Sequence, residues 1–339
     1  MDDLENLRDG LTTAGHETVR IDDGGSLVVS KSHARIYGLS VGRRSPNLLW
    51  VDPELFRPGV TAGDVINGGD YLRFGPEYAH AWTSQPYDFE HLSNYSVQRE
   101  EVPGAWISDG SGELNFRQSE VTLTDHRDGT SSRFSVERSF FPLCDPLRNE
   151  VPTIAYMGYR TCHHIEWHGG TSAGGVDLWN LLQVPPASRL VLPVMGEPRT
   201  RSYFAPGHWV ERPGELTWYL DGRGNSKIGL DAAQLLGRCG VLQQQDEGSW
   251  SLLIKQYPVY PGMRYIDGLG GDQGSGQCFQ AWNGMGFGEV EYHGPGVGCA
   301  PLPREYHDTS MLWAYAGSCD AIKFAGRALL GVDLASHLT

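Results

Sequence analysis

The chain has 339 residues, of which 20% are charged and 40% hydrophobic, a composition typical of a globular protein with an ample core. Its formal net charge of −14 argues against a nucleic-acid partner, because binding phosphates requires a basic surface and no cluster of Lys and Arg occurs. No apolar segment approaches the roughly 20 residues of a membrane span, and residues 1–5 do not have the pattern of a secretory leader. We therefore expect a cytoplasmic protein with no membrane partner.

The predicted elements begin with a short amphipathic helix over residues 4–16, in which Leu4, Leu7 and Leu11 share a face. From residue 18 onward, brief runs of strand-forming residues dominate. Strands are expected at 26–30, 34–40, 47–51, 113–124, 131–141, 153–167, 190–194, 216–220, 252–260, 287–293 and 309–315, with a hairpin at 128–129. Only 231–236 and 319–330 look helical. Many short strands without α/β alternation predict a mainly β fold of stacked antiparallel sheets, in a single domain over 1–339.

Segment 287–295 is the most informative part of the chain, and it reads as a strand that ends at Gly294 and Pro295. Side chains alternate across a strand, so Glu289, Glu291 and His293 share one face, with neighbours roughly 7 Å apart. Burying three ionisable groups is costly unless they have partners. This face is therefore either exposed to solvent or part of the lining of a polar cleft.

A second polar group follows the glycine pair Gly68 and Gly69, which allows unusual backbone dihedrals or the close approach of a ligand. Sugars need hydrogen-bonding groups at their ring edges and flat aromatic faces for stacking. The residues of this segment that offer them are Asp70, Tyr71, Arg73, Glu77, Tyr78, His80 and Trp82. The ordinary alternative is a turn followed by a structural Arg–Glu pair.

Other motifs give weaker signals. His164, Glu166 and His168 would share a strand face and form a plausible metal-ligand set, although a solvated strand end is equally natural there. His307 precedes another expected strand and could act as an acid, while a surface turn is the ordinary interpretation. The sequence contains no nucleophile elbow, phosphate-binding loop or dinucleotide motif, and its six cysteines form no C-x-x-C pair. We expect no metal and no cofactor, and acid–base chemistry on a hydroxylated substrate.

The chain resembles the galactose-mutarotase-like (aldose-1-epimerase-like) superfamily. Within that superfamily, it resembles an uncharacterised bacterial branch more closely than the true epimerases. The residues that carry the resemblance are 68–77, 174–180, 226–230 and 289–295. It implies an antiparallel β-supersandwich with a sugar site on a concave face. In the true epimerases a glutamate on a late strand removes the anomeric hydroxyl proton, and a histidine protonates the ring oxygen. On that pattern Glu289 matches the base, and Glu291 stands where a ligand-binding glutamine is expected.

The chain departs from the epimerase pattern at the acid, because Asn67 stands where the epimerases place a histidine before the glycine pair. Several histidines therefore remain candidates for the acid: His80, His164, His293 and His307.

The sequence thus predicts a carbohydrate-active enzyme, either an isomerase of the epimerase or mutarotase type or a sugar lyase. Glu289 would be the base, with a pKa raised by Glu291, and His80 or His293 the acid. The expected ligand-binding residues are Asp70, Arg73, Glu77, Trp82, Trp179, Glu291, His164 and His307. Two alternatives remain: a sugar-binding module without turnover, and a glycosidase that pairs Glu289 with Glu77 or Asp70. The expected partner is a small carbohydrate.

Overall fold

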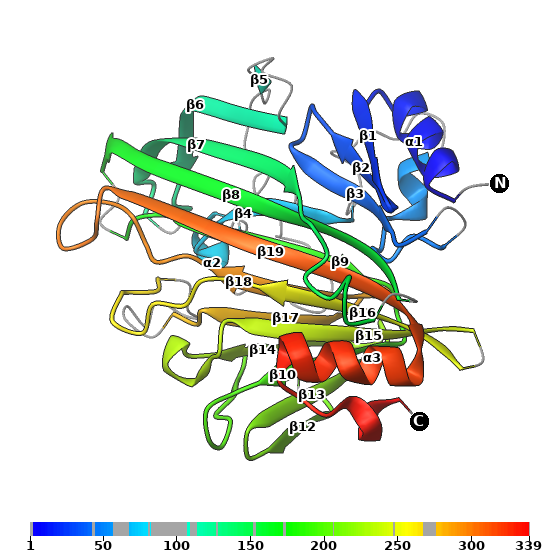
Figure 1. Cartoon of the computed structure of the whole chain (residues 1–339). Helices are drawn as coiled ribbons and strands as arrows, with labels where there is room; N and C mark the ends of the chain where they lie inside the picture. Colours follow the sequence, from blue (N-terminus) through cyan, green and yellow to red (C-terminus); the bar gives the residue numbers. More distant parts are fainter. Residues whose placement is uncertain are drawn as a thin grey trace.

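The computed structural model describes most of the chain, and Figure 1 shows how its elements are arranged. The described residues are 3–42, 45–56, 68–80, 82, 107–108, 114–126, 128–151, 154–171, 174–205, 207–246, 248–266 and 276–338.

Two antiparallel sheets make up most of this structure (Figure 1). The first is nine-stranded, in the order β1 (Thr18–Asp23), β2 (Gly25–Ser30), β3 (Arg35–Ser40), β4 (Asp70–Gly75), β9 (Asp177–Val184), β18 (Phe287–His293), β17 (Phe279–Gly284), β14 (Asn225–Leu230) and β11 (Arg201–Ser202). The second is ten-stranded, in the order β12 (Trp209–Arg212), β13 (Glu215–Leu220), β10 (Ser188–Pro193), β15 (Arg238–Asp246), β16 (Ser249–Gln256), β19 (Glu305–Ser318), β8 (Ala155–Gly170), β7 (Ser131–Pro142), β6 (Leu114–Thr124) and β5 (Ile107–Ser108).

The core lies between the sheets, because each contributes one face of alternating apolar side chains. Leu182 and Val290 of the first sheet belong to the same buried cluster as Leu190, Leu253 and Leu312 of the second. Burying one such side chain stabilises the fold by roughly 1.5–3 kcal/mol. Each strand of the first sheet therefore has one face in this core and one face turned away from it.

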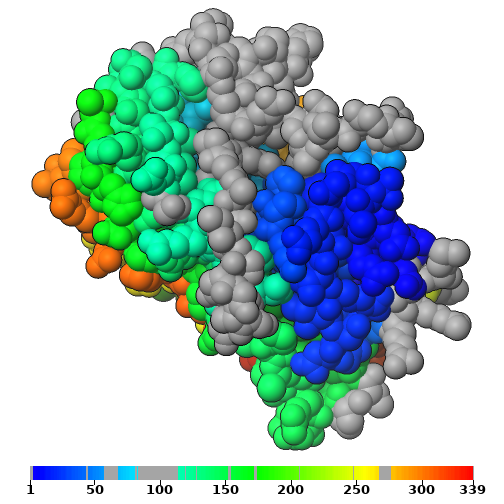
Figure 2. Space-filling view, turned by 90° about the horizontal axis from the view of Figure 1, so that it is seen from above, coloured from blue at the N-terminus to red at the C-terminus, as the bar shows by residue number. Residues whose placement is uncertain are grey.

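Helices cover the outer faces. Helix α1 (Asp3–Thr13) packs Leu4, Leu7 and Leu11 against Val28 and Tyr37 of the first sheet. Helix α3 (Cys319–Ala325) and the π-helical turn Gly326–Leu330 pack against β10, β15 and β16 of the second sheet. A short helix, α2 (Glu77–His80), follows β4, and 3-10 turns occupy Pro53–Phe56, Ala232–Gln234 and Leu334–His337. Seen from above, the N-terminal residues, in blue, occupy one side of the molecule and β6 to β8, in teal and green, the other (Figure 2).

The expected antiparallel β-supersandwich with a short N-terminal helix is confirmed. The hairpin at 128–129 is confirmed too: it joins β6 to β7, and Gly129 has φ +74. Two local expectations were wrong. Residues 47–51 form no strand and make only an isolated bridge from Val51 to Gly68, and 231–236 contains a 3-10 turn rather than a helix. Within the described residues, no helix has the length and apolarity needed to span a bilayer.

Candidate functional site

The two segments singled out in the sequence lie in one sheet, separated by a single strand. β9 pairs with β4 on one side and with β18 on the other, so that Arg73 lies opposite Trp179, and Trp179 opposite His293. Directly opposed residues in antiparallel strands project from the same face. The face turned away from the core therefore carries residues from both segments, and Glu289, Glu291 and His293 share it as predicted.

Glu289 is a buried carboxylate whose hydrogen bonds fall on one oxygen. Its side chain is held by Gln183 Nε2, which donates to Oε1 at 2.6 Å, and by Tyr71, whose hydroxyl donates to the same atom at 3.3 Å. Burial, and then the negative charge of Glu291, raise the pKa of Glu289 to about 7, against the opposing effects of Arg73 and Gln183. Among the described residues, Oε2 of Glu289 has no hydrogen-bond partner. This oxygen can therefore accept a proton from a ligand near neutral pH.

Glu291, two residues along the same strand, forms an ion pair with Lys227. Lys227 Nζ lies 3.1 Å from Glu291 Oε2, and Trp179 Nε1 donates to the same oxygen at 2.8 Å. Lys227 also pairs with Glu77 Oε2 at 3.0 Å, which brings Glu77 into the site. No Lys or Arg of the described chain forms an ion pair with Glu289. The two carboxylates of this strand thus have different partners: Glu291 is paired with a lysine, and Glu289 is held by neutral donors.

His293 ends the row of ionisable groups on this face. Its Nδ1 lies 3.1 Å from Asp177 Oδ1, and its ring stacks on Trp179 with centroids 5.4 Å apart. Asp177 thus orients the imidazole in the way a carboxylate orients many functional histidines. Along the strand, His293 is four residues from Glu289, or roughly 13 Å between Cα atoms.

Trp179 has a different role from the one predicted. Its indole ring contacts two cations in addition to the ring of His293. The guanidinium carbon of Arg73 lies 5.5 Å from the centroid of the indole, and Lys227 Nζ lies 4.7 Å from it. The residue as a whole is 1% exposed. It therefore anchors Glu291 and the two cations, and does not offer a free face for stacking on a sugar.

His80 and Trp82 are not placed beside Glu289 by their described contacts. His80 Nδ1 lies 3.2 Å from the carbonyl oxygen of Thr124, on β6 of the second sheet. Trp82 is buried. Their roles as acid and ligand-binding residue stay predictions, and Asn67 lies outside the described residues.

The prediction that Asp70 binds the ligand was wrong, because its side chain points to the other face of β4. It is completely buried between the sheets, where Arg138 Nη2 and Lys255 Nζ each lie 2.6 Å from its carboxylate. The hydroxyl of Tyr159 donates to Oδ2 at 2.7 Å. Burial alone would raise the pKa of Asp70, but the charges of Lys255 and Arg138 hold it well below its usual value. Asp70 is a structural anion of the core.

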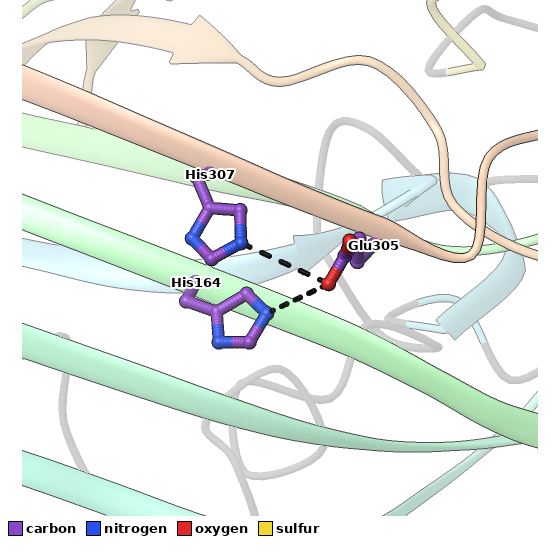
Figure 3. Close-up of side chains that lie close together, drawn as sticks. All are labelled: His164, Glu305 and His307. Carbon is purple, nitrogen blue, oxygen red and sulfur yellow. Dashed lines mark ion pairs between the residues drawn. The ribbon is translucent and has the colours of Figure 1, made fainter.

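The predictions that His164 and His307 belong to this site were also wrong. They lie on β8 and β19 in the second sheet, on the face turned away from the core, and so on the opposite side of the sandwich from Glu289. With Glu305 they form, among the described residues, a group that could hold a metal ion, because one nitrogen or oxygen atom of each lies within 4.8 Å of the others (Figure 3).

Sequence reasoning missed three residues that shape the site: Asp177, Gln183 and Lys227. Asp177 and Gln183 occupy odd positions of β9, on the face of Trp179, and both are buried. Lys227 is a buried cation on β14, 2% exposed. A polar residue inside a predicted buried strand could have indicated these positions, because a buried polar group requires partners.

No protein-family model matches the chain, and neither does any curated protein sequence. Among solved structures, galactose 1-epimerase from Lactobacillus acidophilus NCFM is 11% identical, with 88% of this chain and 94% of that chain covered and a TM-score of 0.43. The protein HI1317 is 10% identical, with 88% and 91% covered and a TM-score of 0.41. At these identities and TM-scores, the matches identify neither the substrate nor the reaction of this chain.

Proposed function

We propose that this protein is a carbohydrate-active isomerase of the epimerase or mutarotase type, in which Glu289 is the general base. The observation that carries the proposal is the state of this carboxylate: it is buried, its pKa is raised to about 7, and its hydrogen bonds fall on Oε1. A base works best when its pKa is near the operating pH, because it is then both ionised and basic enough to accept a proton.

In the proposed reaction, Oε2 of Glu289 takes the proton of the anomeric hydroxyl while an acid protonates the ring oxygen. The bond between C1 and the ring oxygen breaks, and the open-chain aldehyde forms. The aldehyde group then rotates about the bond between C1 and C2. Reversal of both proton transfers closes the ring and gives the other anomer. Atoms balance without a cofactor, since every proton removed by the base is later returned.

His293 is the acid in this proposal. It lies on the face of Glu289, is oriented by Asp177, and is separated from Glu289 along β18 by roughly 13 Å between Cα atoms. Arg73 and Lys227 lie on the same face of the sheet, with their cationic groups over the ring of Trp179.

The alternatives predict different behaviour. A glycosidase that pairs Glu289 with Asp70 is contradicted by the burial of Asp70 between the sheets. A binding module would use the same face of the first sheet without turnover.

The test is Glu289→Gln, which keeps the shape of the side chain but cannot accept a proton. Anomer exchange would be followed by NMR saturation transfer over a panel of aldoses, uronates and keto-sugars, and binding by calorimetry. We expect turnover to fall by about 10²–10⁴-fold with binding retained. Glu197→Gln changes an exposed glutamate and serves as the matched control.

Full activity in Glu289→Gln would refute the role of Glu289. Sugar binding by the wild type without turnover of any member of the panel would favour the binding module.

A further inference from the structure

A row of ionisable side chains crosses three strands of the second sheet, on its outer face. Glu137 on β7, His164 on β8 and His307 on β19 lie directly opposite one another. Glu305 lies two residues before His307 and on the same face of β19 (Figure 3). These four residues, the imidazole–carboxylate row, belong to no part of the proposed catalytic site.

The two imidazoles face the same carboxylate. Nε2 of His164 lies 3.7 Å and Nε2 of His307 lies 3.9 Å from Glu305 Oε2. Figure 3 shows both rings directed toward Glu305, and their planes are stacked with centroids 3.8 Å apart and 5° between them. Oε2 of Glu305 and Nε2 of each histidine thus lie close together, and all three are atoms of the kind that coordinates metals.

The row has little to contribute to folding. The side chains of Glu305 and His307 are each 63% exposed, and exposed ion pairs contribute little to stability. Distances of 3.7 and 3.9 Å are also too long for hydrogen bonds. Nε2 of His164 is buried and has no hydrogen-bond partner among the described residues. A lone pair without a partner, aimed at a carboxylate, is suited to a bound cation.

We propose that His164, His307 and Glu305 bind one divalent transition-metal ion of the Zn²⁺ type. Two imidazoles and a carboxylate favour Zn²⁺, Co²⁺, Ni²⁺ or Cu²⁺ over Mg²⁺ and Ca²⁺, which prefer oxygen ligands. Zinc lies about 2.0–2.2 Å from such ligands, so that tetrahedral ligand atoms are about 3.3–3.5 Å apart. The nitrogen–oxygen pairs would close by roughly half an ångström, a small movement for exposed side chains.

Glu137 would hold His164 in the right orientation for this ion. Its Oε2 lies 3.9 Å from Nδ1 of His164, on the side of the ring away from Glu305. A carboxylate that accepts the Nδ1 proton leaves the lone pair of Nε2 to the metal, as in many carboxylate–histidine–zinc groups. Arg117, whose Nε lies 3.3 Å from Glu137 Oε1, helps to position that carboxylate. Three protein ligands would leave a fourth position for water.

Calorimetric titration of the full chain, purified without a histidine tag, with ZnCl₂ and separately with MgCl₂ tests the proposal. The wild type is expected to bind one equivalent of Zn²⁺ and no Mg²⁺ at the row. His164→Gln, His307→Gln and Glu305→Gln should each weaken Zn²⁺ binding by at least about tenfold, and Glu137→Gln by about tenfold. His168→Gln is the matched control, because His168 is a half-exposed histidine on the same face of β8, four residues from His164.

Circular dichroism of each variant would show that it is folded, and Co²⁺ absorption of the wild type would report tetrahedral coordination. The proposal is overturned if the wild type shows no saturable binding of Zn²⁺. It is equally overturned if His168→Gln loses as much affinity as His164→Gln and His307→Gln.

Discussion

Replacing Asp70 by asparagine is expected to destabilise the protein strongly, although Asp70 does not lie on the face of the sheet that carries Glu289. Its carboxylate is completely buried and neutralises two cations, Arg138 and Lys255, each at 2.6 Å. Asparagine fills the same space but leaves both cations without an anion. Removing one partner of a buried ion pair typically costs about 3–5 kcal/mol, and we expect a free-energy change of at least that size here.

The magnitude can be converted into a melting temperature. At about 2.1 cal/mol/K per residue, unfolding the 339-residue chain carries an entropy of about 0.7 kcal/mol/K. A loss of 3–5 kcal/mol then lowers Tm by about 4–7 °C. Differential scanning calorimetry and urea unfolding would measure both quantities. Asp320→Asn, which breaks the exposed pair with Lys323, is the control and should have little effect.

The pH dependence sharpens this test. The pKa of Asp70 is held well below its unfolded value of 3.8. A carboxyl with a depressed pKa stabilises the folded state above the unfolded pKa, and this contribution is lost as pH falls through the folded pKa. The stability difference between wild type and Asp70→Asn should therefore be constant from pH 5 to 8 and shrink below about pH 4. A variant as stable as the wild type at pH 7, or a difference that does not shrink in acid, would refute this account of the core.

The remaining predictions concern the proposed base, Glu289, and the glycine pair. The kcat/KM of the wild type should rise with pH through about 7, because Glu289 must be ionised to act as a base. Glu291→Gln removes the like charge beside Glu289 and should move the rise in kcat/KM to lower pH. Gln183→Ala removes a hydrogen bond to the ionised form of Glu289 and should move the rise to higher pH. Shifts in the same direction for both variants would contradict the proposal that Glu289 is the base. Gly69→Ala should lower the stability to urea by at least about 1–2 kcal/mol, because φ is +85 and a Cβ would collide with the carbonyl oxygen of Ile36.

The strand that carries Glu289, Glu291 and His293 could be predicted because its alternation is a local property. Residues 287–293 place Glu289, Glu291 and His293 on one face in any register, so the sequence alone was enough to group them. The same reasoning failed for residues 70–75, which were interpreted as a ligand-binding segment and form the strand β4. In a strand, Asp70 and Tyr71 necessarily point to opposite faces.

Contacts that depend on pairing between distant strands could not be predicted. His164 and His307 are opposed because β8 and β19 pair in one particular register. Lys227 reaches Glu291 from β14 across β17. No pattern of residues in either segment specifies such a register, because it is set by the packing of the whole sheet.

Strand β9 joins two features that would otherwise be separate. Its Asn180 donates to Asp70 Oδ1 at 3.0 Å on the core side, while its neighbour Trp179 donates to Glu291 on the other side. One stretch of backbone therefore sets the position of both the interior ion cluster around Asp70 and the carboxylate of Glu291. Substitutions that shift the backbone of β9 should therefore change the melting temperature and the position of Glu291 together.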